Sequence, residues 1–397
     1  MRIGFKLTFR SNKQKYIKIQ IIGRSGILIK VLYLINHAGK AGTERYVETL
    51  VQKLNNKKIK AYFAYNEEGL LVDRLKELGV STYKIKMRNP FDIKAVFEVV
   101  SFCKKQGIEL IHTQFLRENY IALISKLINP SIKVMYTNHF VMKNNKIQRF
   151  FNKLLTKLES NVVAVCNIGK ELLISNGFKR DIINVIFNGV DIEYWREPIK
   201  STLREEFSIP TEEVVFLCSS RFAHDKGHKF LIESVSRLKE QTDLKFKCVL
   251  SNDGPLLDEC KKMVEKLGIK KEVIFTGFRK DIKNLIYGSD IYINASEHEA
   301  LSFAIIEVLA CGIPVIATDM AGNSDIINDE TKCGVLVKYD DVGDLTNAMK
   351  VMMENKKERE TYKKNALITV EDRFNLDKVA NKTYELYEKS CRDLEVN

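Results

Sequence analysis

The sequence predicts an α/β protein built from two doubly wound domains in tandem. Apolar segments of four to seven residues alternate with amphipathic segments along most of the 397-residue chain. This alternation indicates parallel sheets covered by helices on both faces. The alternation stops at the turn-rich residues 188–200 and then restarts. We therefore expect two domains that face each other across a cleft, with ligands at the carboxyl ends of the strands.

The predicted elements follow this alternation in chain order. Strands are expected at 31–36, 61–65, 110–113, 134–139, 161–165 and 184–188, and again at 214–220, 247–251, 273–277, 291–295 and 314–318. Residues 43–54, after the first strand, have the apolar spacing of a helix. The expected parts are a basic extension (1–28), a first domain (29–195), a second domain (196–373) and a final helical segment (374–397) that packs back on the first domain. The extension is either a disordered arm or a product of start-site choice.

The net charge of +13 is distributed unevenly. Residues 1–198 contain 34 Lys and Arg against 16 Asp and Glu, whereas the remainder contains 30 against 35. Residues 1–30 carry eight basic side chains and no acidic one. A basic first domain indicates an anionic surface or substrate as its partner. The alternative is that the charge serves solubility alone. Nucleic acid is less favoured, because no nucleic-acid-binding module is recognisable.

A basic amphipathic helix is predicted over 145–160. Its apolar face comprises Ile147, Phe150, Phe151, Leu154, Leu155 and Leu158, and its opposite face comprises Lys146, Arg149, Lys153 and Lys157. Such a helix can lie on an anionic membrane, although packing of its apolar face into the core is the more common arrangement. Together with the acid-free first thirty residues, it favours a peripheral location on a membrane.

The cysteines and the hydropathy indicate the compartment. Eight scattered cysteines without a C-x-x-C pair are typical of reduced thiols rather than of disulfides or a zinc site. We find no apolar run of the ~18 residues that span a bilayer, and no secretory signal pattern. We therefore expect a cytoplasmic protein, peripheral on the inner face of the plasma membrane.

Three motifs indicate the chemistry. In residues 219–234, Arg221 and Lys226 lie on a predicted strand-to-helix loop, where two cations beside a helix N-terminus suit a diphosphate. Surface solvation is the alternative for any basic pair. The loop 37–42 contributes Gly39 and Gly42, which let the backbone approach a ligand closely. That loop is a weak signal by itself.

The third motif, residues 297–318, places two acids around an apolar helix. Ser302 is expected to cap a helix that runs through Leu309, with Glu299 before it and Glu307 inside it. The free N–H groups around Ser302 and Phe303 would face an anion. A buried carboxylate needs a polar partner, so Glu307 is expected to accept hydrogen bonds from a sugar diol. The alternative is that Glu307 pairs with a neighbouring Lys or Arg.

From about Ile29 to Lys389 the chain resembles the retaining glycosyltransferases of family 4, which have the GT-B fold of two Rossmann-like domains. The matching motifs are Ser220-Arg221-Phe222, Lys226-Gly227, Leu231-Ile232, Asn252-Asp253-Gly254-Pro255, Asn188-Gly189-Val190-Asp191, Glu299 with Glu307, residues 310–317, Ala41-Gly42-Thr43-Glu44-Arg45, Thr137-Asn138-His139 and the aromatic helix from Phe374 to Tyr387. Several of these motifs are common individually, but their order along the chain is specific.

The resemblance implies roles for particular residues. Arg221 and Lys226 would hold the donor diphosphate, Glu307 the ribose and Glu299 the donor sugar, with His139 near the transferred sugar. The expected catalytic residues are His139, Glu299, Arg221 and Lys226. The expected donor-binding residues are Gly39, Gly42, Arg221, Lys226, Gly254, Phe278, Ser302, Phe303 and Glu307.

Two departures from the family pattern leave the sugar and the base open. The usual Glu-Gly-Phe-Gly is Glu299-Ala300-Leu301-Ser302 here, and a glycine is replaced by Asn252. The sequence has no Asp-x-Asp tripeptide, and two cations can stabilise a leaving diphosphate, so we expect no metal and no cofactor besides the nucleotide sugar. The resemblance implies attack on the front face of the sugar, with the leaving diphosphate helping to deprotonate the acceptor.

The expected function is transfer of a sugar from a UDP- or GDP-sugar to a lipid-linked acceptor, in the synthesis of cell-surface polysaccharide or glycolipid. Such an acceptor suits a basic first domain. One alternative is a nucleotide-sugar epimerase or hydrolase on the same fold. Another is a catalytically inactive module that binds a membrane surface.

Overall fold

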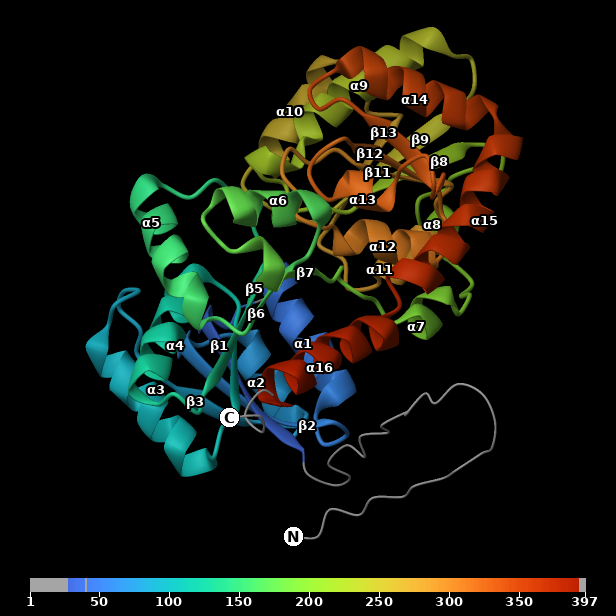
Figure 1. The fold of residues 1–397 in the computed structure, drawn as a ribbon. Helices are drawn as coiled ribbons and strands as arrows, with labels where there is room; N and C mark the ends of the chain where they lie inside the picture. The colour runs from blue at the N-terminus through green and yellow to red at the C-terminus, as the bar shows by residue number, and fades with distance from the viewer. Residues whose placement is uncertain (1–27, 40, 393–397) are drawn as a thin grey trace, which may run out of the picture.

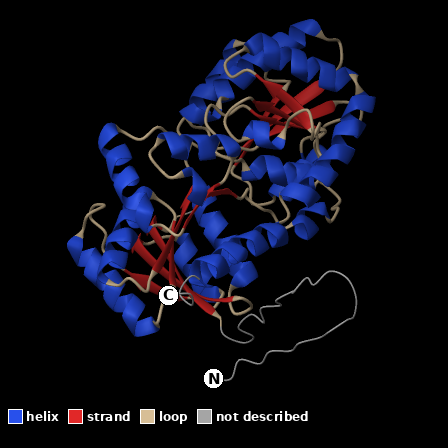
Figure 2. Cartoon of the chain, viewed as in Figure 1, coloured by secondary structure: helices blue, strands red, loops and turns tan. Residues whose placement is uncertain are grey.

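The protein, described by a computed structural model over residues 28–39 and 41–392, contains two α/β domains (Figure 1). Residues 1–27 of the predicted extension and 393–397 of the final segment lie outside the described residues. Figure 2 shows a sheet at the centre of each domain, surrounded by helices. The predicted fold class is confirmed, since all strand pairs in both sheets are parallel.

The first domain has a seven-stranded sheet in the order β3-β2-β1-β4-β5-β6-β7. The strands are β1 (Ile29–His37), β2 (Ile59–Glu67), β3 (Ser81–Lys84), β4 (Leu110–Thr113), β5 (Lys133–Asn138), β6 (Asn161–Ala164) and β7 (Ile183–Val185). The helices are α1 (Gly42–Leu54), α2 (Leu70–Glu77), α3 (Ile93–Gln106), α4 (Leu116–Ile128), α5 (Lys146–Leu155) and α6 (Asn167–Ser175), with short 3-10 turns η1 (Thr156–Leu158) and η2 (Arg180–Ile182).

The second domain has a six-stranded sheet in the order β10-β9-β8-β11-β12-β13. The strands are β8 (Val214–Cys218), β9 (Phe246–Ser251), β10 (Val273–Gly277), β11 (Ile291–Asn294), β12 (Val315–Thr318) and β13 (Gly334–Val337). The helices are α7 (Ile192–Arg196), α8 (Leu203–Glu206), α9 (His228–Gln241), α10 (Leu257–Lys266), α11 (Ile282–Tyr287), α12 (Phe303–Ala310), α13 (Asn323–Ile326), α14 (Val342–Glu354) and α15 (Lys356–Arg373), with the 3-10 turn η3 (His224–Lys226).

Both sheets change direction at their first strand. The chain runs outward from β1 to β3 and then returns to place β4 beside β1, and β8 and β11 repeat this arrangement. In open parallel sheets, a crevice forms at the carboxyl ends of the two strands where the order reverses. The residues that follow β1, β4, β8 and β11 are therefore the ones positioned to bind a ligand.

A last helix returns the chain to the first domain. Helix α16 (Leu376–Arg392) begins where Phe374 O accepts a hydrogen bond from Val190 N at 2.9 Å, and Leu376 N donates to Val190 O at 3.1 Å. A Cβ on Gly189 would lie 2.8 Å from Leu376 Cα, so this close crossing requires glycine there. The helix then packs against the first domain, where the hydroxyls of Tyr387 and Tyr33 lie 3.0 Å apart.

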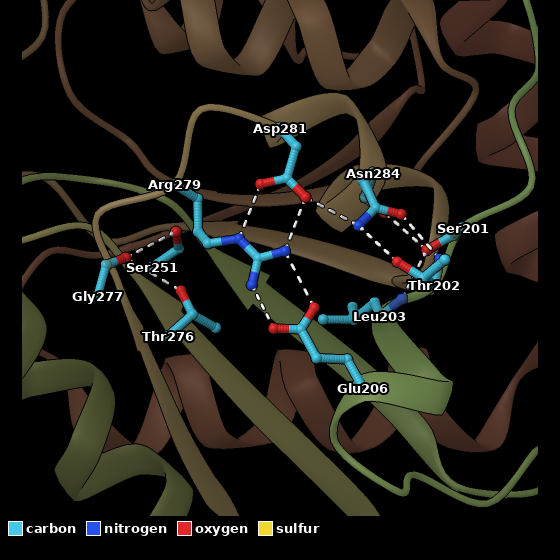
Figure 3. Close-up of polar contacts among 10 residues, drawn as sticks. All are labelled: Ser201, Thr202, Leu203, Glu206, Ser251, Thr276, Gly277, Arg279, Asp281 and Asn284. Atoms are coloured by element: carbon cyan, nitrogen blue, oxygen red, sulfur yellow. Dashed lines mark hydrogen bonds and ion pairs between the residues drawn. The ribbon is translucent and has the colours of Figure 1, made fainter.

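The segment that enters the second domain is fixed by a cluster of polar contacts around Arg279 (Figure 3). The Arg279 guanidinium donates to both oxygens of Asp281 and both oxygens of Glu206. Thr202 N donates to Asn284 Oδ1 at 2.8 Å, and Asn284 Nδ2 returns a bond to Thr202 Oγ1 at 3.1 Å. The hydrogen bonds from Arg279 hold the pKa of Asp281 well below its usual range. These contacts attach the connection between the domains to the loop that follows β10.

Candidate active site

A cleft with a cavity volume of about 780 Å³ lies between the domains, at the carboxyl ends of strands that include β1, β5, β8 and β11. Its first-domain wall comes from residues 41–43 and 139–142, and its second-domain wall from the loops after β8 and β11. The predicted site residues that line it are Gly42, His139, Arg221, Lys226, Glu299 and Phe303. The structure therefore brings together residues that are up to 261 positions apart in the sequence.

Lys226 is held at the cleft by the glycine that follows it. Gly227 has φ +65°, and a Cβ there would lie 1.9 Å from the carbonyl oxygen of Ala295, at the end of β11. The Lys226 ammonium lies 2.9 Å from Glu299 and 3.4 Å from Asp225. Burial lowers the pKa of Lys226, but the two carboxylates outweigh that effect and the pKa is raised overall. Lys226 is therefore a fixed cation.

Arg221 lines the same cleft and its side chain is exposed. Its loop is supported from behind by Gly254, which has φ +147° and whose Cβ, if present, would lie 2.5 Å from the carbonyl oxygen of Phe222. Phe222 N also donates to Asp253 O at 2.8 Å. Gly254 was predicted to bind the donor and does not line the cleft. In this structure it supports the loop that carries Arg221.

His139 stands opposite the two cations, at the end of β5. Its Nε2 lies 2.9 Å from Gln114 Oε1, and its ring packs edge-on against Tyr46 with centroids 4.9 Å apart. Because an amide oxygen only accepts hydrogen bonds, Nε2 carries the proton and Nδ1 keeps its lone pair. Burial lowers the pKa of His139 to about 3, so the imidazole is neutral near pH 7.

A buried polar network lies behind His139. His112, on β4, bonds to the Tyr387 hydroxyl through Nδ1 and to Thr137 Oγ1 through Nε2, both at 2.7 Å. Thr137 Oγ1 lies 3.5 Å from the hydroxyl of Tyr46, the ring that packs on His139. Burial lowers the pKa of His112 to about 3. The network connects the last helix, α16, to the wall of the cleft.

The glycine loop after β1 is organised by Glu44. Its carboxylate accepts hydrogen bonds from Gly39 N at 3.2 Å and from Ala41 N at 3.1 Å. A Cβ on Gly39 would lie 2.6 Å from the His37 ring, whereas Gly42 is exposed and its Cβ would lie 3.9 Å from the Phe303 ring. Gly42 and Phe303 thus narrow the cleft from opposite domains.

A second cavity of about 560 Å³ continues beyond Gly42 and Phe303 and contains Glu307. Glu307 projects from α12, and its carboxylate forms an ion pair with the guanidinium of Arg45 from α1. The Arg45 guanidinium also lies over the Phe303 ring, 4.9 Å from its centroid. Burial lowers the pKa of Arg45 to about 10. The partner of the buried acid in this structure is therefore an arginine of the other domain, which was the alternative expectation for Glu307.

Two further predicted residues, Ser302 and Phe278, do not line either cavity. Ser302 caps α12 as expected, because its Oγ accepts a hydrogen bond from Ile305 N at 3.4 Å; the side chain is buried. Phe278 follows β10, is partly exposed, and does not line either cavity. Its predicted part in donor binding stays a prediction.

Sequence reasoning missed two residues that shape the site. Arg45 belongs to one of the family motifs but was given no role, because its partner Glu307 lies 262 positions away in the sequence. Gln114, which orients His139, directly follows β4. A buried polar residue at the carboxyl end of a strand beside β1 is a signal that could have identified Gln114.

Three negative findings apply to the part of the chain that the structure describes. No group of three or more His, Cys, Asp and Glu side chains is placed to hold a metal ion there. None of the described helices combines the length and apolar character that crossing a bilayer requires. All eight cysteines, which fall within the described residues, are free thiols, and seven are buried.

Two family models match the chain, one in each domain. Glycosyltransferase Family 4 matches residues 41–194, and Glycosyl transferases group 1 matches residues 199–368. Together the matches cover both walls of the cleft.

Relatives of known function include two bacterial enzymes. The UDP-Gal:alpha-D-GlcNAc-diphosphoundecaprenol alpha-1,3-galactosyltransferase of Escherichia coli is 25% identical over 75% of this chain and 79% of its own length. The N-acetylgalactosamine-N,N'-diacetylbacillosaminyl-diphospho-undecaprenol 4-alpha-N-acetylgalactosaminyltransferase of Campylobacter jejuni is 26% identical over 66% of this chain and 72% of its own.

Solved structures share the fold. A glycosyltransferase from Rickettsia africae superposes with a TM-score of 0.84 at 23% identity, over 93% of this chain and all of the other. Anabaena HepE in complex with UDP superposes with a TM-score of 0.81 at 20% identity, over 91% of this chain and all of the other. With both family models matched and the two-domain architecture shared, the chain is a glycosyltransferase of family 4 with the GT-B fold.

Proposed function

We propose that this enzyme transfers a sugar from a nucleotide-sugar donor to an acceptor with retention of the anomeric configuration. The observation that carries the proposal is the placement of Arg221 and Lys226 on one wall of the cleft, with His139 on the other. Fixed cations lower the barrier where a diphosphate leaves, because negative charge grows there in the transition state.

The donor is proposed to bind along the two connected cavities. Its diphosphate lies at Arg221 and Lys226, its sugar between Glu299 and His139, and its ribose hydroxyls at Glu307. UDP is the nucleotide tested first, because the name of the E. coli relative specifies UDP-Gal and Anabaena HepE was solved with UDP. GDP stays the second choice.

The proposed reaction breaks the bond between C1 of the sugar and the diphosphate oxygen. An acceptor oxygen forms the new bond to C1 on the same face, and its proton passes to an oxygen of the leaving diphosphate. Neutral His139 contributes a hydrogen bond to the sugar rather than a charge. Two cations and the capped N-terminus of α12 supply the positive potential, which supports transfer without a metal ion.

The acceptor is proposed to be lipid-linked, in the synthesis of a cell-surface glycan on the cytoplasmic face of the membrane. The two bacterial relatives support this, since their names specify undecaprenol-linked acceptors. The excess of basic side chains in residues 1–198 also suits an anionic acceptor.

Calorimetric titration tests the donor site. Wild-type protein, Lys226→Ala and Glu307→Gln are titrated with UDP, GDP and ADP in the presence and absence of a chelator. Lys262→Ala, an exposed lysine on α10, is the matched control. We expect one nucleotide to bind with or without chelator, and both site variants to weaken that binding at least tenfold or so, the effect of losing one charge-assisted contact.

The same titration separates the alternatives. Absence of binding by the wild type would favour the inactive binding module. Nucleotide binding with turnover of UDP-sugar in the absence of any acceptor would favour the epimerase or hydrolase. Retention of configuration is checked by NMR of the anomeric proton in the product.

A further inference from the structure

The apolar stripe of α5 faces away from the protein. The exposed fractions of Ile147, Phe150 and Leu154 are 69%, 65% and 55%. Their spacing of three and four residues places them on one side of the helix. Packing of this stripe into the core, one of the two interpretations drawn from the sequence, is therefore wrong for these three residues. We call the three side chains the α5 face.

The inner side of α5 is attached by polar contacts, which explains this orientation. Asn152 is buried, accepts a hydrogen bond from the Tyr120 hydroxyl at 2.6 Å and donates to Asn176 O at 2.8 Å. Phe151, beside it, packs on Phe91 with ring centroids 4.9 Å apart. Asn152 and Phe151 thus fix the inner side of α5, which leaves Ile147, Phe150 and Leu154 exposed as an apolar patch suited to an apolar environment outside the domain.

The charges around the α5 face have one sign. Residues 140–158 contain five basic side chains and no Asp or Glu. All five are exposed, namely Lys143, Lys146, Arg149, Lys153 and Lys157. Apolar side chains flanked by cations suit the boundary between the headgroups and acyl chains of an anionic bilayer.

The apolar surface extends to the mouth of the cleft. Phe140 and Met142, in the loop between β5 and α5, are 52% and 66% exposed and also line the cleft. Phe140 directly follows His139. Figure 1 shows α5 on the outer side of the first domain, away from α16. A surface that holds the α5 face would thus lie next to the wall of the cleft that His139 lines.

We propose that the α5 face docks on the surface of an anionic lipid bilayer. A second copy of the chain is a poor occupant, because pairing two such faces would bring ten cations together. Residues 1–27 of the same chain are also poor, because they carry seven basic side chains and no acid. The docking itself does not depend on the proposed function; only its use, to present a lipid-linked acceptor to the cleft, rests on it.

Co-sedimentation of the full chain with vesicles tests the docking. One set of vesicles contains phosphatidylglycerol and phosphatidylcholine, and the other contains phosphatidylcholine alone. The site variants are Phe150→Ser/Leu154→Ser and Lys146→Glu/Lys153→Glu. The matched controls, on the second domain, are Leu244→Ser/Ile368→Ser and Lys261→Glu/Lys266→Glu, which also change exposed side chains.

We expect the wild type and both controls to bind the anionic vesicles, with weaker binding as salt rises, and both site variants to lose about tenfold or more of that binding. Unchanged binding by the site variants would overturn the proposal and assign binding to another surface, such as residues 1–27. If the wild type forms dimers and the Phe150→Ser/Leu154→Ser variant is monomeric, the α5 face binds a second copy and the proposal is overturned. Equal binding of the wild type to both vesicle types would overturn the requirement for anionic lipid.

Titration of the same variants with UDP separates this proposal from the proposed function. Phe150→Ser/Leu154→Ser is expected to bind UDP as the wild type does, because neither side chain lines the donor cavities. If the wild type binds anionic vesicles through the α5 face but binds no nucleotide, the docking stands and the proposed function fails.

Discussion

The buried carboxylate of Glu307 and the guanidinium of Arg45 form an ion pair that joins the two domains. The side chain of Glu307 is 8% exposed and that of Arg45 is 37% exposed. A ribose diol that hydrogen-bonds to both oxygens of Glu307 must compete with Arg45 for one of them. The ion pair and the proposed nucleotide complex are therefore alternatives at the same carboxylate.

This competition predicts opposite effects for the two partners. Arg45→Met should tighten UDP binding by about fivefold, the factor that corresponds to about 1 kcal/mol for a partly exposed ion pair, whereas Glu307→Gln should weaken it. Calorimetry measures both, with Arg180→Met as the control, because Arg180 is an exposed arginine of η2 that pairs with Glu171 and lines neither cavity. If both substitutions weaken binding equally, Arg45 is part of the nucleotide site and does not compete with it.

His139 is expected to make stability depend on pH. Its pKa of about 3 in the folded protein lies below the value of about 6.5 in an unfolded chain. Below pH 6.5 the unfolded chain takes up a proton that the folded protein does not, so His139 should lower the free energy of unfolding by about 1.4 kcal/mol per pH unit down to about pH 3. Urea titrations at pH 4, 5 and 6, which lie within that window, give the free energy of unfolding at each pH. This free energy should fall less steeply with decreasing pH in His139→Gln than in the wild type. An unaltered slope would mean that the imidazole is protonated in the folded protein.

Glu159, in the first domain, should have the opposite dependence. Burial raises its pKa to about 8, although its Oε1 accepts a hydrogen bond from Asn119 at 2.7 Å. The carboxyl is therefore protonated in the folded protein at pH values where the unfolded chain is ionised. Glu159→Gln keeps the acceptor for Asn119 and should raise the free energy of unfolding by roughly 2–4 kcal/mol at pH 8, with the gain vanishing near pH 4.5.

Urea unfolding at the two pH values checks the Glu159 prediction. Glu98→Gln, an exposed change on α3, should have no effect at either pH. A stabilisation by Glu159→Gln that is the same at both values would show that the carboxyl does not titrate between them.

Gly227 should be far less replaceable than a glycine of the same backbone conformation elsewhere. Gly227 and Gly268 have φ of +65° and +68°, but a Cβ meets the Ala295 carbonyl in the first case and nothing within 4 Å in the second. Gly268→Ala should cost about 1 kcal/mol of stability, the strain of the left-handed conformation alone. Gly227→Ala should cost several kcal/mol and weaken UDP binding, because the Lys226 loop must move. If urea unfolding shows the same loss of stability for Gly227→Ala and Gly268→Ala, the chain accommodates the contact between the new Cβ and the Ala295 carbonyl at no extra cost.

Much of the fold was predictable because both sheets are parallel and covered on two sides. Their central strands are continuous apolar runs, such as residues 31–35, which are fully buried. The edge strands β3 and β13 were missed. Both are only four residues long and partly buried, and β3 also lacks an apolar run. Edge strands are specified by pairing with a neighbour more than by their own hydropathy.

The candidate site was predictable only where a local motif carries the chemistry. The loop with Lys226 and Gly227, and the capped helix after Ser302, were found because each is complete within a few residues. The partners of Glu307 and His139 were not, since Arg45 and Gln114 lie on distant segments that only the assembled sheets bring near. On α5, periodicity revealed an apolar stripe but not its direction, which is set by what Asn152 contacts.

The hydrogen bonds of Val190 with Phe374 and Leu376 have a mechanical consequence. The chain passes between the domains twice, once after β7 and once before α16, and at this point the two passages run side by side. A single connecting strand would allow the domains to swing and to twist about it. Two segments that are hydrogen-bonded to each other resist twisting better than one does. This junction therefore favours rotation about a single axis, a motion that would open and close the cleft while its two walls stay opposite each other.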